Sequence, residues 1–294
     1  MPTTRPRRVR LKGVEVALTV DRPVAERIKS MPPYRWLGPG KAARPLTDGE
    51  PDINGTGMDA IDWYHTIDLP GGVVTPGFVD HRAQVDLYGL PESLAGKRCL
   101  DVATFDGFWA FEMEKRGAAE VIGIDVHSLA DCDVPENWRE EYLKARPNEI
   151  KGAGFAYAKR ALGSKVRRHV LSVYELSPER IGTFDFVFMS DLLLHLRDPL
   201  RALERLWTVT RGEAIIADTY DKELEATAPL NSMRVLLGMD DYSGCFWWNF
   251  TPGAIEVLLR VARFTDVEKV AQLDLDTRLG VVVPKVVFRA KGGR

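Results

Sequence analysis

Two aspartates, each at the end of a short apolar run, are the residues best suited to chemistry at a binding site. Residues 99–125 read as a strand, a tight loop, a helix and a second strand, with Asp101 ending the first run and Asp125 the second. In an open α/β sheet, ligands bind where the loops leave the carboxyl ends of the strands, so both acids should face one crevice. The pattern predicts a site for a nucleoside-type cofactor.

The loop after the first strand distinguishes between cofactors. A pyrophosphate needs a glycine-rich turn in which backbone N–H groups approach it closely. Here Gly107 is the one glycine, and Asp106 beside it would repel a phosphate. S-adenosylmethionine (SAM) carries a sulfonium and an ammonium and no phosphate, so Asp101 and Asp106 would attract it and Asp125 would accept its ribose hydroxyls. The alternative is an ordinary βαβ unit with polar strand ends. The loop residues expected to contact SAM are Ala103, Thr104, Phe105 and Gly107.

The elements that must position these acids alternate along the chain. Apolar runs separated by helical segments predict core strands at residues 98–101, 121–124, 166–170, 184–189 and 214–218. Such alternation predicts a parallel sheet with helices on both faces. The last run, residues 280–290, follows a strand near 264–270 after a connection too short for a crossover helix, so this pair should be antiparallel.

Further signals predict helices and a hairpin. Asp198 and Thr251 suit the N-cap position, and each precedes a proline, which favours the first helical turn. Nearer the N-terminus we expect a short helix near residues 24–31, a small hairpin within 63–77 and a helix over 78–90.

Two segments lie outside the alternating pattern. Residues 1–90 form a predicted N-terminal extension that covers cofactor and substrate, and residues 91–294 form the predicted SAM-binding domain. Residues 223–250 interrupt that domain as a lid. The aromatic side chains of the lid suit a flat or sugar-like acceptor, or else pack the lid on the core. The expected substrate-binding residues are Met233, Trp247, Trp248 and Phe250.

Composition limits the functional classes. The net charge is −2, whereas an enzyme that binds tRNA or DNA usually has a basic excess, so we expect a small-molecule acceptor and no nucleic acid. No apolar run is long enough to span a membrane and no signal peptide is visible, which predicts a cytoplasmic protein. Cys99, Cys132 and Cys245 fit no metal-binding spacing, and no metal is expected. For the oligomeric state, a homodimer is the assembly that we consider.

Residues 99–125 resemble motif I and the following acidic motif of class I SAM-dependent methyltransferases. The chain keeps Asp101 and Gly107 of that pattern and has Ala103 at the first glycine position. The resemblance implies a Rossmann-like α/β fold with a mostly parallel seven-stranded sheet and an antiparallel C-terminal hairpin. The further cofactor contacts that it implies are Val126 and His127 at the ribose or adenine, Ser172 and Val173 at the adenine, and Ser190 beside the methionine portion.

A closer resemblance combines residues 63–77, 99–125 and 184–203. Together they resemble a subgroup related to the tRNA wobble-uridine carboxymethyl- or methyltransferases. The tRNA enzymes that use carboxy-SAM carry a tyrosine where this chain has Leu194, and an arginine of their final strand is absent from residues 284–287. These differences favour ordinary SAM, and methyl transfer over carboxymethyl transfer.

Methyl transfer needs a positioned nucleophile and, for a phenolic acceptor, a base. Positioning can lower the barrier by roughly 7–11 kcal/mol. Histidine is the best base near neutral pH, and we rank His195 and His65 first, with Asp191 as the carboxylate alternative. The candidates to cover the methionine end of SAM are Trp63, Tyr64 and Arg82. There an arginine would pair with the carboxylate of the cofactor, unless it forms a surface salt bridge instead.

The sequence therefore predicts a SAM-dependent methyltransferase that methylates an oxygen of a small-molecule acceptor, phenolic or sugar-like, in secondary metabolism. The product of the cofactor would be S-adenosylhomocysteine. Three alternatives stay open: a tRNA or other RNA methyltransferase, a SAM-binding protein without catalysis, and a nicotinamide oxidoreductase. Ala103 and Phe105 in the cofactor loop keep the non-catalytic alternative open.

Overall fold

The chain divides into two units, Met1–Pro45 and Leu46–Arg294. The computed structural model describes residues 7–11, 14–18, 46, 49–145, 151–228, 230–236 and 246–293. In the first unit, β1 (Arg7–Leu11) pairs with β2 (Val14–Leu18) in antiparallel fashion. The helix predicted near residues 24–31 lies outside the described residues. Residues 46–90, predicted as part of an N-terminal extension, belong to the second unit.

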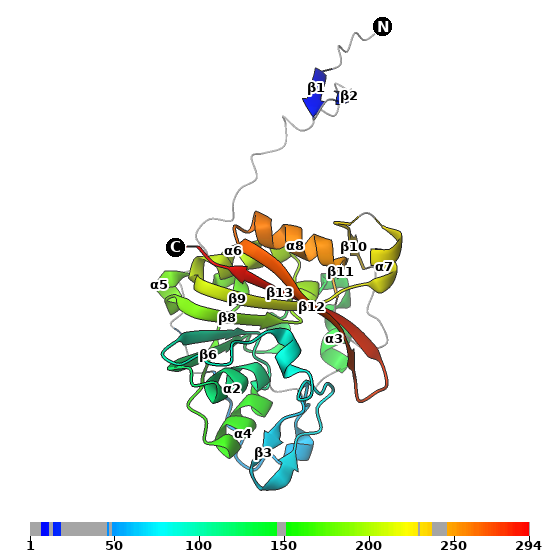
Figure 1. Ribbon diagram of the computed structural model, residues 1–294. Helices are drawn as coiled ribbons and strands as arrows, with labels where there is room; N and C mark the ends of the chain where they lie inside the picture. The colour runs from blue at the N-terminus through cyan, green and yellow to red at the C-terminus, as the bar shows by residue number, and fades with distance from the viewer. Residues whose placement is uncertain are drawn as a thin grey trace. The chain divides into compact units, whose positions relative to one another are not determined.

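A seven-stranded sheet forms the centre of the second unit (Figure 1). Its strands are β5 (Arg98–Val102), β6 (Glu120–Asp125), β7 (Arg167–Val170), β8 (Phe184–Ser190), β9 (Thr210–Thr219), β12 (Thr265–Asp276) and β13 (Val282–Lys291). In space, β7, β6, β5, β8 and β9 lie side by side and run parallel, and β13 and β12 continue the sheet as antiparallel strands. The structure confirms the mostly parallel sheet with an antiparallel C-terminal hairpin.

Helices cover both faces of the sheet because its central strands are apolar on both sides. Successive side chains of a strand point to opposite faces. In β8, Phe186 and Phe188 face α2 (Phe108–Lys115) and α4 (Ala153–Leu162), whereas Val187 and Met189 face α5 (Pro178–Ile181), α6 (Pro199–Val209) and α8 (Pro252–Val261). All four strand side chains are buried. Figure 1 shows α2 and α4 on one side of the sheet and α6 and α8 on the other.

The two predicted helix starts are confirmed. The Asp198 carboxylate accepts a hydrogen bond from the Arg201 N–H (3.0 Å) at the start of α6, and the Thr251 hydroxyl accepts one from the Ala254 N–H (3.2 Å) at the start of α8. Each cap satisfies a helical N–H that has no partner within the helix. This unit also contains α3 (Arg139–Ala145), α7 (Lys222–Thr227), β10 (Met233–Val235) and β11 (Trp248–Phe250).

The segment before β5 contains the predicted hairpin and lacks the predicted helix. β3 (Asp68–Leu69) and β4 (Val73–Val74) pair in antiparallel fashion, as expected. The prediction of a helix over residues 78–90 is wrong, because that stretch holds only a short 3-10 helix at Val85–Tyr88. Val79 instead forms β-bridges with both His65 and Thr277, so pairing with distant segments overrides the local helical pattern.

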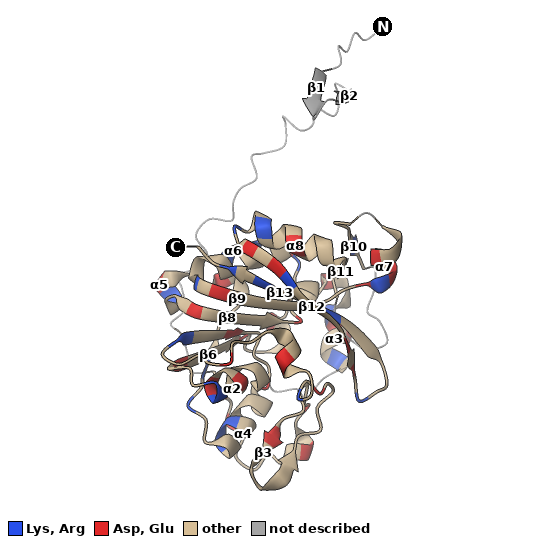
Figure 2. Cartoon of the chain, viewed as in Figure 1, with Lys and Arg blue, Asp and Glu red and all other residues tan. Residues whose placement is uncertain are grey.

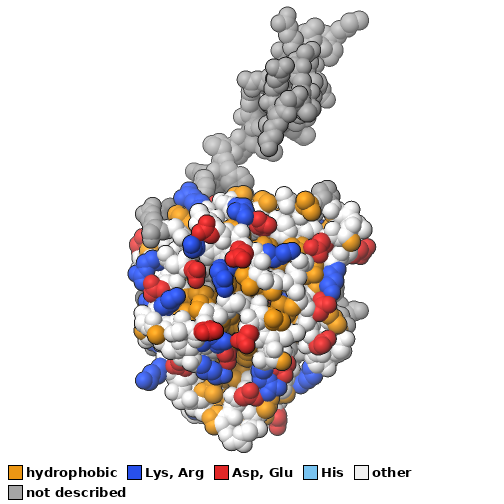
Figure 3. Space-filling model, in the orientation of Figure 1, with side chains coloured by type: hydrophobic (Ala, Val, Ile, Leu, Met, Phe, Trp, Pro, Cys, Tyr) orange, Lys and Arg blue, Asp and Glu red, His pale blue; other side chains and the backbone are white. Residues whose placement is uncertain are grey.

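Charge on the second unit is mixed in sign. On the face shown in Figure 2 and Figure 3, acidic and basic side chains are interspersed and form no continuous basic surface. Within the described part of the chain, no helix has the length and apolar character needed to cross a membrane.

Replacing Gly107 should destabilise the fold more than replacing another glycine with positive φ. Gly107 has a φ of +91°, and a Cβ built on it would lie 2.6 Å from the Phe111 ring and 2.7 Å from the Phe155 ring. We expect Gly107→Ala to lower the free energy of unfolding by roughly 2–5 kcal/mol, from backbone strain and overpacking together. Gly163 has a φ of +64°, and nothing lies within 4 Å of the position that a Cβ would take there, so Gly163→Ala should cost only about 1–2 kcal/mol. Urea unfolding of both variants measures this difference, and equal losses would contradict the packing argument.

Candidate active site

A cavity of about 1400 Å³ lies at the carboxyl ends of the parallel strands. Its walls include Asp101, Asp125, Ser172 and Asp191, which end or follow β5, β6, β7 and β8 respectively. The sequence predicted a binding crevice at this edge. Sites for one small ligand typically enclose about 300–1,000 Å³, so this cavity has room for a cofactor together with an acceptor.

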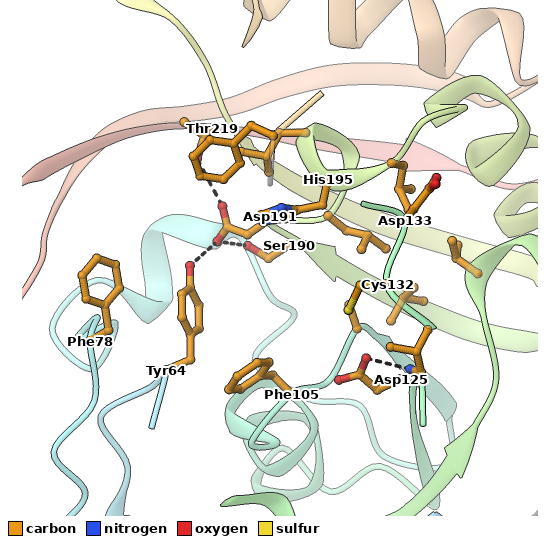
Figure 4. Close-up of a pocket in the computed structure, with 18 of the residues that line it drawn as sticks. Tyr64, Phe78, Phe105, Asp125, Cys132, Asp133, Ser190, Asp191, His195 and Thr219 are labelled. Carbon is orange, nitrogen blue, oxygen red and sulfur yellow. Dashed lines mark hydrogen bonds between the residues drawn. The ribbon is translucent and has the colours of Figure 1, made fainter. Parts of the chain in front are cut away.

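Asp125 lines the cavity and has one carboxylate oxygen without a hydrogen-bond donor in the described part of the chain. The residue is 8% exposed, one carboxylate oxygen accepts a hydrogen bond from the Val126 N–H (2.7 Å), and the buried Oδ2 has no partner among the described residues (Figure 4). Behind it, the buried Arg168 guanidinium donates to the Val126 carbonyl (3.1 Å) and to the Gly49 carbonyl. A buried carboxylate oxygen without a donor fits a ligand that brings hydroxyl donors, such as a ribose.

Asp101 is more deeply buried than Asp125. The Thr104 hydroxyl donates to its carboxylate (2.7 Å), and burial raises the pKa of Asp101 to about 7. A carboxyl group with that pKa changes charge within the physiological range, so a cationic ligand nearby would favour its ionised form.

The loop between β5 and α2 is strained where it faces the cavity. Ala103 has a φ of +61° and Phe105 a φ of +46°, both in the left-handed region that non-glycine residues rarely adopt. Both residues line the cavity. Thr104 and Gly107 are not among the lining residues: Thr104 binds Asp101, and Gly107 packs on aromatic rings.

The predicted adenine residues, Ser172 and Val173, line the cavity beyond β7. The Ser172 hydroxyl accepts a hydrogen bond from the Tyr174 N–H (3.3 Å), which fixes the turn that follows the strand. The Tyr174 hydroxyl donates to Asp133 (2.8 Å), which also lines the cavity. Hydrogen bonds within the protein thus fix the wall at this end of the cavity.

At the β8 end, Asp191 is the centre of a polar cluster (Figure 4). Its Oδ1 is bound by Lys285 Nζ and lies 3.3 Å from the Thr219 hydroxyl, and its Oδ2 lies 3.1 Å from the Ser190 hydroxyl and 3.4 Å from the Tyr64 hydroxyl. All five residues line the cavity. Asp191 has a φ of +53°, another non-glycine residue in the left-handed region.

The two leading histidines are placed differently. His65 is 5% exposed, and its Nδ1 is bound to the Asp106 carboxylate, which also accepts the His65 N–H (2.8 Å). His195 is half-buried in the cavity wall, with its ring centroid 5.0 Å from that of Phe246. His127, a predicted ribose or adenine contact, is exposed and is not among the lining residues.

Trp63 lines the cavity, whereas Arg82 does not. The indole N–H of Trp63 donates to the Met58 carbonyl (3.0 Å). Arg82 is exposed and forms ion pairs with Asp80 (2.7 Å) and Asp68 (2.5 Å). The surface salt bridge, the alternative weighed for Arg82, is the arrangement observed.

The four predicted lid residues are not among the lining residues of this cavity. Phe250 is fully buried in the core, and Met233 pairs with it across β10 and β11 and is 39% exposed. The indoles of Trp247 and Trp248 donate to the backbone carbonyls of Asp133 and Leu196. Core packing thus accounts for Phe250, and hydrogen bonds to the backbone hold Trp247 and Trp248. The lid contributes other residues to the cavity. Those residues are Leu236, Phe246 and Asn249.

Tyr64, a candidate for the methionine end of SAM, lines the cavity. Several other lining residues were missed by sequence reasoning, chiefly Phe78, Thr219 and Lys285. The signal for Lys285 was a lysine between apolar residues in the terminal strand. Among the described residues, no group of three or more histidine, cysteine, aspartate or glutamate side chains could hold a metal ion.

Comparison with known proteins supports one family. A family model described as "Methyltransferase domain" matches residues 81–269 of the 294-residue chain. The tRNA U34 carboxymethyltransferase of Pseudomonas paraeruginosa is 30% identical over 176 residues, covering 59% of this chain and 46% of that protein. The protein of the same name from Ectopseudomonas mendocina is 28% identical over 177 residues, covering 59% and 47%. The chain spans about half the length of the curated relatives it matches.

Solved structures agree on the fold. The N-terminal domain of EvdMO1 with S-adenosylhomocysteine bound has a TM-score of 0.55 at 15% identity and covers 84% of this chain and 99% of that chain. The same domain in the presence of S-adenosylhomocysteine and D-fucose has a TM-score of 0.54 at 16% identity, with the same coverage. With the sheet order, the acid-lined edge and the family match together, the chain belongs to the class I SAM-dependent methyltransferases.

Proposed function

We propose that this protein transfers the methyl group of SAM to an oxygen of a small-molecule acceptor. The observation that carries the proposal is the unpartnered carboxylate oxygen of Asp125, a residue that lines a cavity of about 1400 Å³ at the carboxyl edge of the sheet. A ribose would satisfy that oxygen, and the remaining volume would admit a second ligand.

Residues along the sheet edge would bind the cofactor in one orientation. Asp125 would accept the ribose hydroxyls, Ser172 and Val173 would flank the adenine, and Asp101 would attract the cationic portion. Trp63 and Ser190 would border the methionine portion. When bound, SAM supplies a methyl carbon that is activated by its sulfonium, and the carbon–sulfur electron pair leaves with S-adenosylhomocysteine.

The chain's own residues would position the acceptor and take its proton. We assign the proton to the imidazole of His195, which would receive it from the acceptor hydroxyl as the new oxygen–carbon bond forms. His65 also lines the cavity, but it is only 5% exposed, whereas His195 is half-buried and therefore more accessible to an acceptor. Exclusion of water by the lining side chains would favour methyl transfer over hydrolysis.

The acceptor side of the cavity supports a flat or sugar-like acceptor. Tyr64, Phe78 and Phe246 supply aromatic surface, and Ser190 and Thr219 supply hydroxyl groups. Aromatic walls with a few polar groups are typical of sites for small molecules. The fold neighbour EvdMO1, whose structure was determined in the presence of D-fucose, is consistent with a sugar-like acceptor.

A tRNA acceptor is the second candidate, favoured by the 30% identity to a tRNA U34 carboxymethyltransferase. The net charge of −2 and the interspersed surface charges weigh against it. Leu194 also stands where the enzymes that use carboxy-SAM carry a tyrosine, which favours methyl over carboxymethyl transfer. A gel shift of tRNA that weakens steeply with salt would favour this candidate.

Asp125→Asn should weaken SAM binding about 10–100-fold, because a charge-assisted hydrogen bond contributes about 1.5–3 kcal/mol. Calorimetry with SAM measures the change. Asp86→Asn is the matched control, because Asp86 is a fully exposed carboxylate outside the cavity lining, and its affinity should equal that of the wild type. Unchanged affinity in Asp125→Asn would contradict the proposed ribose contact.

SAM affinity should rise with pH between about 6 and 8. Asp101 has a pKa of about 7, so its carboxyl is neutral below that pH and anionic above it, and the anion attracts the cationic cofactor. Linkage limits the rise to about tenfold per pH unit below 7. Asp101→Asn should remove this dependence of SAM affinity on pH. If the dependence persists in the variant, another titrating group causes it.

His195→Ala should lower turnover by about 10²–10⁴-fold while SAM affinity changes little, because a general base contributes to that extent. Release of S-adenosylhomocysteine with a panel of phenolic and glycoside acceptors gives the rate, and His127→Ala is the control because His127 is exposed outside the cavity lining. Full activity in the His195 variant, with loss in His65→Ala, would move the base to His65.

A further inference from the structure

The Asp191 carboxylate is fully occupied by protein donors. Lys285 and the Thr219 hydroxyl contact one oxygen, and the hydroxyls of Ser190 and Tyr64 contact the other (Figure 4). A carboxylate offers about four lone-pair positions, so none remains to accept a proton from a ligand. Asp191 is therefore unsuited to act as the base, the role considered for it as an alternative to histidine.

Lys285 brings the positive charge that balances this carboxylate. It lies on β13 directly opposite Thr219 of β9, is 1% exposed, and donates a second hydrogen bond to the Thr219 hydroxyl (3.0 Å). A buried charge is costly unless it is paired. Burial lowers the pKa of Lys285 to about 7. Below that pH the cluster thus combines one carboxylate, one ammonium and three hydroxyls, and its net charge is zero.

The order of the strands puts this cluster at one end of the proposed cofactor site. Asp125 ends β6 and Ser172 follows β7, whereas Asp101 ends β5 and Asp191 follows β8 on the opposite side. A nucleoside with its ribose at Asp125 and its base at Ser172 would extend its remaining part toward β5 and β8. The sulfonium would then approach the Asp191 cluster.

We propose that Lys285 is a positioning residue that cancels the charge of Asp191, so that the cluster presents hydroxyl groups and no net charge to the sulfonium. The inference rests on the proposed orientation of the cofactor. An unbalanced carboxylate would stabilise the cationic substrate more than the neutral thioether product. The positive charge on the sulfur decreases toward the transition state. The carboxylate would therefore stabilise bound SAM more than the transition state, which slows methyl transfer.

The ratio of SAM affinity to S-adenosylhomocysteine affinity tests this without a known acceptor. Calorimetry with both ligands at about pH 6, where Lys285 is charged, should show that Lys285→Met raises the ratio at least about tenfold, because the unbalanced carboxylate would attract the cationic sulfonium and not the neutral thioether. Lys285→Arg keeps the charge, and the double variant Lys285→Met, Asp191→Asn removes both charges. Both should stay within about threefold of the wild-type ratio.

The control is Lys291→Met, on the same strand, where Lys291 pairs with Asp266 (3.0 Å) and is exposed. A wild-type ratio in folded Lys285→Met, or an equal rise in the double variant, would overturn the inference. If thermal unfolding shows that Lys285→Met does not fold, Asp191→Asn gives the converse measurement, a fall of at least about tenfold, and no fall would overturn it. The effect of Asp125→Asn on SAM affinity tests the proposed function, whereas the ratio of the two affinities tests only the charge balance at Asp191.

Discussion

A carboxylate removed from water must be paired or hydrogen-bonded, and that constraint organises the binding edge of this protein. Asp101, Asp125 and Asp191 come from three neighbouring parallel strands, and each meets the constraint differently. Thr104 and a raised pKa accommodate Asp101, and Lys285 balances Asp191. Asp125 is left with one oxygen that has no partner among the described residues. The edge is therefore built to be completed by a ligand with hydroxyl donors.

The two sides of this edge suit two different ligands. The side near β6 and β7 has rigid walls and the unsatisfied carboxylate, which suit recognition of a nucleoside. The side near β8 and β9 combines the balanced cluster of Asp191 with aromatic side chains and His195, which suits an acceptor and its proton. Strained backbone at Ala103, Phe105 and Asp191 lies along this boundary, as expected where function constrains conformation.

The sequence predicted the sheet and its acids well, because apolar runs and strand ends are local patterns. The positions of Asp101, Asp125 and Ser172 followed from the strands that carry them. Contacts between residues that are far apart in the sequence could not be predicted in this way. Val79 lies in a segment predicted as a helix but forms β-bridges with His65 and Thr277. The indoles of Trp247 and Trp248 donate to backbone carbonyls that are distant in the sequence. The role of Lys285 depends on its register opposite Thr219, which no single strand reveals.

The most direct measurement is a crystal structure of the protein with S-adenosylhomocysteine. The account predicts both ribose hydroxyls within hydrogen-bond distance of the Asp125 carboxylate, the adenine beside Ser172 and Val173, and the sulfur on the side of Asp101 and Asp191. A nucleoside in the reverse direction, or a cavity closed to it by the Phe105 ring, would contradict it.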